Sequence, residues 1–265
     1  MGKVEQKASQ IENHPVAAGF ASVGHVVNGL VHILIGALAV GVATGLGGES
    51  ADKPGAMRAI RSTPVGGIVL WVAAIALFAL AVYSVISAIG LAREDAKDAV
   101  KAAGQGIGFG AVGSVALTYA LGGSSDGEQT NESISAQLMA TTWGAVLLFI
   151  IGAVVLAIGI GMIVNGVKKK FLKDVDISGR FRTTFSRLGT VGYIAKGVSI
   201  GIMGGLFIVA VLTRNPDEAA GLDGALKTLI GLPFGVFLLV LVGVGLILYG
   251  IFCFAKARTV VRRAD

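Results

Sequence analysis

The sequence predicts an all-α integral membrane protein, with six transmembrane helices arranged as three parallel two-helix repeats in a pseudo-threefold bundle. Three observations predict this fold: long stretches without charge, a block that recurs three times, and an uneven distribution of Lys and Arg. Apolar residues make up 54% of the 265 residues and charged residues only 14%. We treat residues 1–265 as a single membrane domain, because no connection between the predicted helices is long enough to hold a folded soluble domain.

Six stretches are long enough to cross a bilayer. A hydrocarbon core about 30 Å thick needs about 20 apolar residues in a helix, and five longer stretches contain no Asp, Glu, Lys or Arg. A sixth, from Leu188 to Thr213, is interrupted only by Lys196. The predicted transmembrane helices are 22–45, 64–91, 103–122, 141–167, 188–213 and 232–255. The first 20 residues are polar and of mixed charge, unlike a signal peptide, so we expect the first helix to remain as an anchor.

A recurring block divides the chain into three repeats, at approximately 20–92, 100–168 and 187–257. The block that contains Pro64-Val-Gly66 returns with Pro233-Phe-Gly235, and a weaker copy contains Thr142-Trp-Gly144. Proline loses no needed hydrogen bond in the first turn of a helix, so Pro64 and Pro233 mark the start of the second helix of a repeat. Because a two-helix unit returns to the side on which it began, all three repeats are parallel. This arrangement disfavours transporters that depend on inverted repeats.

The distribution of basic residues predicts that both termini are cytoplasmic. Sixteen of the 22 Lys and Arg residues fall on the side of the termini and five on the other side. An excess of Lys and Arg marks the cytoplasmic side of a membrane protein. The net charge of +6 therefore indicates topology and contacts with anionic lipid headgroups at the cytoplasmic face. We do not expect nucleic acid as a partner.

Glycines four residues apart recur within the predicted helices. They are Gly41–Gly45, Gly106–Gly110, Gly197–Gly201–Gly205 and Gly231–Gly235. Small residues at this spacing let helix backbones approach closely in lipid. We interpret these glycines as packing faces, within the chain, in a homo-oligomer or against another membrane protein. The alternative is that they line a conduit.

Lys196 is the one charged residue inside a predicted span. It follows Arg187 by nine residues, a rise of roughly 13 Å in a helix, which places it within the hydrocarbon core. A lysine there costs several kcal/mol unless it reaches water or a partner. In the functional interpretation Lys196 binds an anion or substrate. In the structural one it extends to the cytoplasmic interface or bonds helix carbonyls.

Aligning the repeats at Gly24, Gly104 and Gly192 predicts which residues accompany Lys196. This alignment places Lys196 in register with Asn28 and Gly108, and Tyr193 in register with His25 and Gln105. If equivalent faces of the repeats meet, the polar members form one intramembrane site. The candidate site residues are Lys196, Tyr193, His25, Asn28 and Gln105.

No catalytic residue, cofactor or metal site is predicted. His25 and His32 lie on one helix, so they cannot both be axial ligands of one haem, and a metal would need further ligands. Cys253 is the only cysteine and cannot form an internal disulfide. The sequence contains no recognisable set of nucleophile and base and no pair of intramembrane carboxylates, so we expect that the protein is not an enzyme.

The third repeat resembles a known family. Leu188-Gly-Thr-Val-Gly192-Tyr193-Ile-Ala-Lys196-Gly197, followed by Gly224-Ala-Leu, Pro233-Phe-Gly235 and Leu248-Tyr249-Gly250, is similar to an actinobacterial membrane family known as domain of unknown function 1206. The resemblance extends over nearly the whole chain and implies a multi-pass protein of a bacterial plasma membrane. It implies no substrate, cofactor or catalytic residue. Mitochondrial carriers also have three two-helix repeats, but their Pro-x-acid-x-x-base motif is absent here.

Two functions remain open at this point. The first is a non-catalytic membrane scaffold or accessory subunit that packs through glycine-rich helix faces. The second is a small channel or transporter with a polar or anion-binding site around Lys196. The absence of intramembrane acids and the parallel repeat favour the first.

Overall fold

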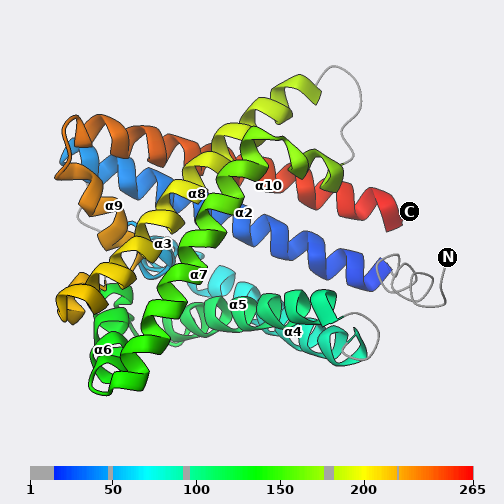
Figure 1. Cartoon of the computed structure of the whole chain (residues 1–265). Helices are drawn as coiled ribbons and strands as arrows, with labels where there is room; N and C mark the ends of the chain where they lie inside the picture. The colour runs from blue at the N-terminus through cyan, green and yellow to red at the C-terminus, as the bar shows by residue number, and fades with distance from the viewer. Residues whose placement is uncertain (1–14, 47–49, 92–95, 176–181, 220, 265) are drawn as a thin grey trace. The chain divides into compact units, whose positions relative to one another are not determined.

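A computed structural model gives the fold of residues 15–46, 50–91, 96–175, 182–219 and 221–264. Within these residues every regular element is a helix, as predicted (Figure 1). The α-helices are α2 (Pro15–Thr44), α3 (Lys53–Arg61), α4 (Gly66–Leu91), α5 (Ala96–Ala120), α6 (Gly127–Met139), α7 (Thr142–Val167), α8 (Arg182–Thr213), α9 (Leu222–Ile230) and α10 (Gly235–Ala264). Two short 3₁₀ helices follow long ones, η1 (Lys170–Asp174) after α7 and η3 (Pro216–Glu218) after α8.

The helices follow one another in three groups of long, short and long. These groups are α2–α3–α4, α5–α6–α7 and α8–α9–α10. The short helices fall in the block that recurs in the sequence. In α3 and α9 the recurring Gly-Ala pairs, Gly55-Ala56 and Gly224-Ala225, belong to the buried face. The short helix is therefore amphipathic, as its recurring sequence predicts.

A glycine begins or nearly begins the second long helix of each group, and close backbone packing explains it. A side chain on Gly66 would collide with the carbonyl oxygen of Ile60. The same collision would occur between Gly144 and Leu138, and between Gly235 and Leu229. In each case the carbonyl lies six residues earlier, near the end of the short helix. The prolines of Pro64-Val-Gly66 and Pro233-Phe-Gly235 lie two residues before α4 and α10, so the helices begin slightly later than predicted.

Five of the helices are long and apolar enough to cross a membrane. Their apolar segments are Ser22–Thr44, Gly66–Leu91, Thr142–Val167, Arg182–Thr213 and Gly235–Thr259. A helix, α5, also covers the predicted span 103–122, but it is not among the five. Its first turns carry Lys97, Asp98 and Lys101, and many of its other residues are Gly or Ala, so it is less apolar than the other long helices. The chain therefore has the apolar helices of a multi-pass membrane protein.

The chain divides into two compact units. Unit 1 consists of residues 1–28, 60–124 and 253–265, and unit 2 of residues 29–59 and 125–252. In unit 1, α4 packs against α5. A side chain on Gly106 of α5 would lie 3.2 Å from the carbonyl oxygen of Ala81 on α4, so the two backbones run close together there.

In unit 2, glycines seven residues apart bring the long helices into backbone contact. On α7 these glycines are Gly152 and Gly159, and on α8 they are Gly197 and Gly204. A side chain on Gly159 would lie 2.7 Å from the Gly197 carbonyl oxygen, and one on Gly152 would lie 3.0 Å from that of Gly204. Figure 1 shows the two helices side by side. The seven-residue spacing is typical of helices that cross at about 20°.

The same spacing joins the blue α2 to the red α10 in Figure 1. Side chains added to Gly36 and Gly243 would each meet the carbonyl oxygen of the other glycine, and one added to Gly250 would meet that of Gly29. The two helices are antiparallel, because Gly29 pairs with the later glycine of α10. The glycines predicted at a spacing of four only partly coincide with these contacts, since a side chain on Gly205 would meet nothing within 4 Å.

Candidate functional site

Lys196 lies on α8 in unit 2, and an aromatic ring accompanies its charge. Its Nζ lies 4.3 Å from the centroid of the Tyr249 ring, which belongs to α10. A cation over an aromatic face is attracted by the electrons of the ring, by about 0.5–2 kcal/mol. The close approach is possible because Gly192, one turn before Lys196, has no side chain: a Cβ there would lie 2.6 Å from the Tyr249 Cα.

Tyr249 belongs to a larger cluster of rings within unit 2. Its ring lies 4.8 Å from the ring of His32 and 5.3 Å from that of Tyr193, measured between centroids. Tyr193 stacks on Phe171 of η1 at 5.0 Å, and Phe252 contacts both at 6.0 and 5.1 Å. We call Tyr193, Tyr249, His32, Phe171 and Phe252 the aromatic cluster. It holds η1, α2, α8 and α10 together around the base of the Lys196 side chain.

The other predicted members of the intramembrane site, His25, Asn28 and Gln105, lie in unit 1. The Asn28 amide donates a hydrogen bond to the Cys253 Sγ at 3.3 Å. His25 is half-buried on α2, whereas Gln105 on α5 is exposed. The structure thus brings Tyr193 and Lys196 together around Tyr249, and the meeting of all five residues stays a prediction.

The aromatic cluster has no arrangement typical of a metal or catalytic site. His32 is 8% exposed, and its ring packs on Tyr249. Among the described residues, no three His, Cys, Asp or Glu side chains gather closely enough to hold a metal ion. Through its rings and Lys196 the cluster offers cation–π contacts, stacking and hydrogen bonds, which suit packing or the binding of a polar group.

A second polar cluster joins the short helices α3, α6 and α9 in unit 2. Asp223 at the start of α9 is 1% exposed. Its Oδ1 accepts a hydrogen bond from the Ala51 amide at 2.7 Å, and its Oδ2 lies 2.6 Å from the Lys227 Nζ. Asp52 Oδ1 accepts one from the Gly55 amide at 2.8 Å. A side chain on Gly127 of α6 would lie 2.5 Å from Asp52 Oδ2, so all three short helices meet at these carboxylates.

The surroundings of Asp52 favour its protonated form. Burial raises the pKa of Asp52 above its ordinary 3.8, and the nearby charges of Asp223 and Asp126 raise it further. The Gly55 amide and the Arg58 charge act in the opposite direction without cancelling the effect. This carboxyl therefore titrates at a higher pH in the folded protein than in the unfolded chain.

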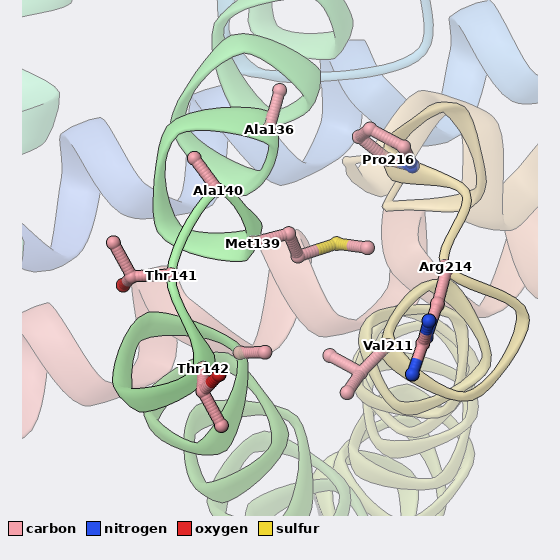
Figure 2. A pocket seen from close by; sticks show the side chains of 9 residues that line it. Ala136, Met139, Ala140, Thr141, Thr142, Val211, Arg214 and Pro216 are labelled. Carbon is pink, nitrogen blue, oxygen red and sulfur yellow. The ribbon is translucent and has the colours of Figure 1, made fainter.

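An open pocket of about 520 Å³ lies next to the short helix α6, between the ends of α7 and α8. Figure 2 shows Met139 and Val211 projecting into it from two sides, with Arg214 on the side of Val211. Its lining is Ala136, Met139, Ala140, Thr141, Thr142, Ala145, Val211, Arg214 and Pro216. The Thr141 hydroxyl is already engaged, because it accepts a hydrogen bond from the Gly144 amide at 3.0 Å and so caps α7. The pocket offers one cation and an apolar floor, without a nucleophile and base in contact.

Sequence reasoning missed Tyr249, Asp52 and Asp223 as members of these clusters. Tyr249 occurs in the Tyr-Gly step of the third repeat, seven residues after Gly243 and next to Gly250. That position beside a packing glycine is the signal that could have placed its ring at a helix contact. Asp223 directly precedes the recurring Gly224-Ala225 pair, where a side chain able to cap the short helix was to be expected.

A protein of Bacillus subtilis (strain 168) named "Uncharacterized protein YxxB" is similar to the chain over almost its full length. The two are 28% identical over 265 residues, which cover 97% of this chain and 94% of the relative. No solved structure matches the chain.

The family described as Domain of Unknown Function (DUF1206) matches the chain three times, over residues 23–90, 100–169 and 191–260. The first two matches begin 77 residues apart, as do the contact glycines Gly29 and Gly106, whereas Gly24 and Gly104 are 80 apart. Both observations place the second repeat three residues earlier than the alignment through Gly104. Lys196 is then in register with Asn28 and Gln105, instead of Gly108. The matches confirm the resemblance, and the chain belongs to the DUF1206 family.

Proposed function

We propose that the protein is a non-catalytic scaffold or accessory subunit of a bacterial plasma membrane, with six spans and both termini in the cytoplasm. In this proposal α5 is the sixth span, and the three repeats surround a pseudo-threefold axis. Partners are anionic lipids, further copies of the chain or other membrane proteins, which it contacts through glycine-rich and apolar helix faces.

One recurring helix contact supports this proposal. Ala81 on α4, Gly159 on α7 and Gly250 on α10 each lie 15 residues after the glycine that follows the short helix. They contact Gly106 on α5, Gly197 on α8 and Gly29 on α2, respectively. The last helix of each repeat thus packs on the first helix of the next, and the last repeat packs on the first. Backbone contacts of this kind fill the space between helices and leave no room for a conduit between them.

The spans also leave much apolar surface available. On α7, only Leu148, Gly152, Gly159 and Gly166 are buried by the rest of the chain. The remaining side chains of this helix would face lipid or a partner protein. A helix with this much unburied surface can serve as the contact face of a scaffold, although lipid alone would also satisfy it.

Purification and reconstitution together test the scaffold proposal. We expect the mildly solubilised protein to migrate as a homo-oligomer or to carry a stoichiometric membrane-protein partner. In liposomes we expect no ion or solute flux above that of protein-free vesicles. A partner-free protein that conducts an ion or solute in liposomes would contradict the proposal.

A small channel or transporter is the second candidate, and the corrected register favours keeping it. Asn28, Gln105 and Lys196 now occupy the same position of the three repeats. A polar residue at one depth in every repeat is typical of a site for a polar or anionic solute. In that case Lys196→Met would abolish flux, whereas Lys227→Met, on a short helix outside the spans, would retain it.

A further inference from the structure

A basic pocket of about 370 Å³ lies in unit 2 where the chain turns from α7 to α8. Lys169 and Leu172 line it from the turn and η1. Arg182, Thr183, Ser186 and Arg187 line it from the first turns of α8. The pocket thus combines three cations, two hydroxyls and one apolar side chain, and none of its lining residues is acidic. We call this set the basic pocket.

The aromatic cluster fixes one wall of the basic pocket. The Phe171 side chain is fully buried and stacks on Tyr193. It also occupies the space beside Gly189, where a Cβ would lie 2.7 Å from the Phe171 Cζ. Because Phe171 lies between Lys169 and Leu172 in sequence, its anchoring holds both residues against the start of α8. Lys169 adopts a left-handed backbone with φ of 53°, which reverses the chain directly after α7.

The other wall follows from helix geometry. Arg182 and Ser186 are four residues apart, as are Thr183 and Arg187, so both pairs lie on neighbouring rows of one helix face. Ser186 is only 8% exposed and forms part of the pocket wall beneath the arginines. Two guanidinium groups and an ammonium group with hydroxyls beside them suit a phosphate, because guanidinium binds phosphate oxygens in pairs.

The position of the pocket favours a lipid as the source of the phosphate. The pocket begins where the apolar segment of α7 ends, at Val167, and its α8 wall precedes the apolar run that starts at Leu188. Val164 and Val167 on α7 are 38% and 61% exposed. They provide an apolar surface beside the pocket, on which acyl chains can lie. A soluble phosphate would gain nothing from this surface.

We propose that the basic pocket binds the phosphate group of an anionic phospholipid, with the acyl chains along the end of α7. The lipid would hold α7, η1 and α8 together at the cytoplasmic interface. The site does not depend on whether the protein is a scaffold or a transporter, so its test is independent of that proposal.

Lipid binding to the delipidated full-length protein tests this site, with native mass spectrometry as the readout. The probes are phosphatidylglycerol, phosphatidylcholine and inorganic phosphate. We expect phosphatidylglycerol to bind at least about tenfold more tightly than phosphatidylcholine, because the pocket has an uncompensated positive charge. Millimolar inorganic phosphate should not displace it. Displacement at that concentration would overturn the assignment to a lipid and identify a site for soluble phosphate.

Two double variants with equal charge change separate a site from a general attraction. The variant Arg182→Gln/Arg187→Gln removes two cations from the pocket. The variant Lys168→Gln/Lys170→Gln removes two exposed cations that flank Lys169 without lining the pocket. We expect the first to weaken phosphatidylglycerol binding by roughly tenfold or more and the second by less than about threefold. Equal losses would overturn the proposal.

A charge-preserving variant covers the case in which the first variant does not fold. Arg182→Lys/Arg187→Lys keeps both charges but loses the paired geometry of guanidinium. We expect it to weaken phosphatidylglycerol binding more than Lys168→Gln/Lys170→Gln does, although it removes no charge. Binding equal to that of the unmodified protein would contradict a built phosphate site.

Discussion

At the scale of single residues, Lys196 shows how a charged side chain can be accommodated inside an apolar helix. Its Nζ lies over the Tyr249 ring, and Tyr249 is in turn held by His32 and Tyr193. Gly192 allows the backbone of α10 to come close enough for this contact. The lysine therefore has a structural role available to it, whether or not it also contacts a solute.

A double-mutant cycle tests the contact between Lys196 and Tyr249. We expect Lys196→Met and Tyr249→Leu to be coupled by about 0.5–2 kcal/mol, measured as the free energy of unfolding in detergent. Tyr249→Phe is the control, because it keeps the ring face, and it should retain most of the coupling. If the two single effects simply add, the cation–π contact does not contribute to stability.

The raised pKa of Asp52 predicts a pH dependence of stability. Between the ordinary pKa of 3.8 and the raised folded value, the folded protein binds more protons at this residue than the unfolded chain does. The contribution of Asp52 to stability is therefore greatest at low pH and decreases as the pH rises through this window. Asp52→Asn keeps the acceptor for the Gly55 amide and does not titrate.

Unfolding of the protein and of Asp52→Asn as a function of pH measures this contribution. We expect the variant to be relatively more stable at neutral pH than at pH 4, compared with the unmodified protein. Asp217→Asn serves as a control, because Asp217 is an exposed acid in η3. A difference between Asp52→Asn and the unmodified protein that does not change with pH would contradict the raised pKa.

At the scale of helices, packing depends on which glycines face a neighbour. The chain has 40 glycines, so spacings of four and of seven both occur by composition. The sequence favoured the spacing of four, but the contacts of α2, α7, α8 and α10 follow the spacing of seven. Only the choice of neighbouring helix decides between them, and a single sequence does not contain that information.

Two glycines of α7 provide a matched pair of substitutions. A side chain on Gly159 would lie 2.6 Å from the Gly201 backbone nitrogen and 2.7 Å from the Gly197 carbonyl oxygen, whereas one on Gly161 would meet nothing within 4 Å. We expect Gly159→Ala to destabilise the protein by about 1–3 kcal/mol through overpacking. We expect Gly161→Ala to be neutral or to stabilise it by up to about 1 kcal/mol, because alanine favours helix.

Thermal unfolding of both variants in the same detergent distinguishes these outcomes. The comparison controls for helix propensity, because both residues lie in α7 and two positions apart. Equal effects of the two substitutions would show that the α7–α8 backbone contact does not contribute to stability.

At the scale of the whole molecule, the helices could be predicted and their partners could not. The charge-free stretches predicted the long helices, because an apolar run of this length has few other stable structures. The recurring block predicted the short helices that end at Gly66, Gly144 and Gly235. The second repeat was misaligned by three residues, since Gly104 lies among several glycines and no contact distinguished Gly104 from Gly106. The aromatic cluster joins residues from four elements, which no local pattern brings together.

The recurring contact between successive repeats is the central claim about the whole molecule, because it fills the space between helices with backbone. A density map of the purified full-length protein in lipid nanodiscs tests it most directly. We predict continuous packing at Gly29–Gly250, Ala81–Gly106 and Gly159–Gly197, with no water or lipid between the paired helices. A water-filled or solute-filled passage between any of these pairs would contradict the account and favour the transporter.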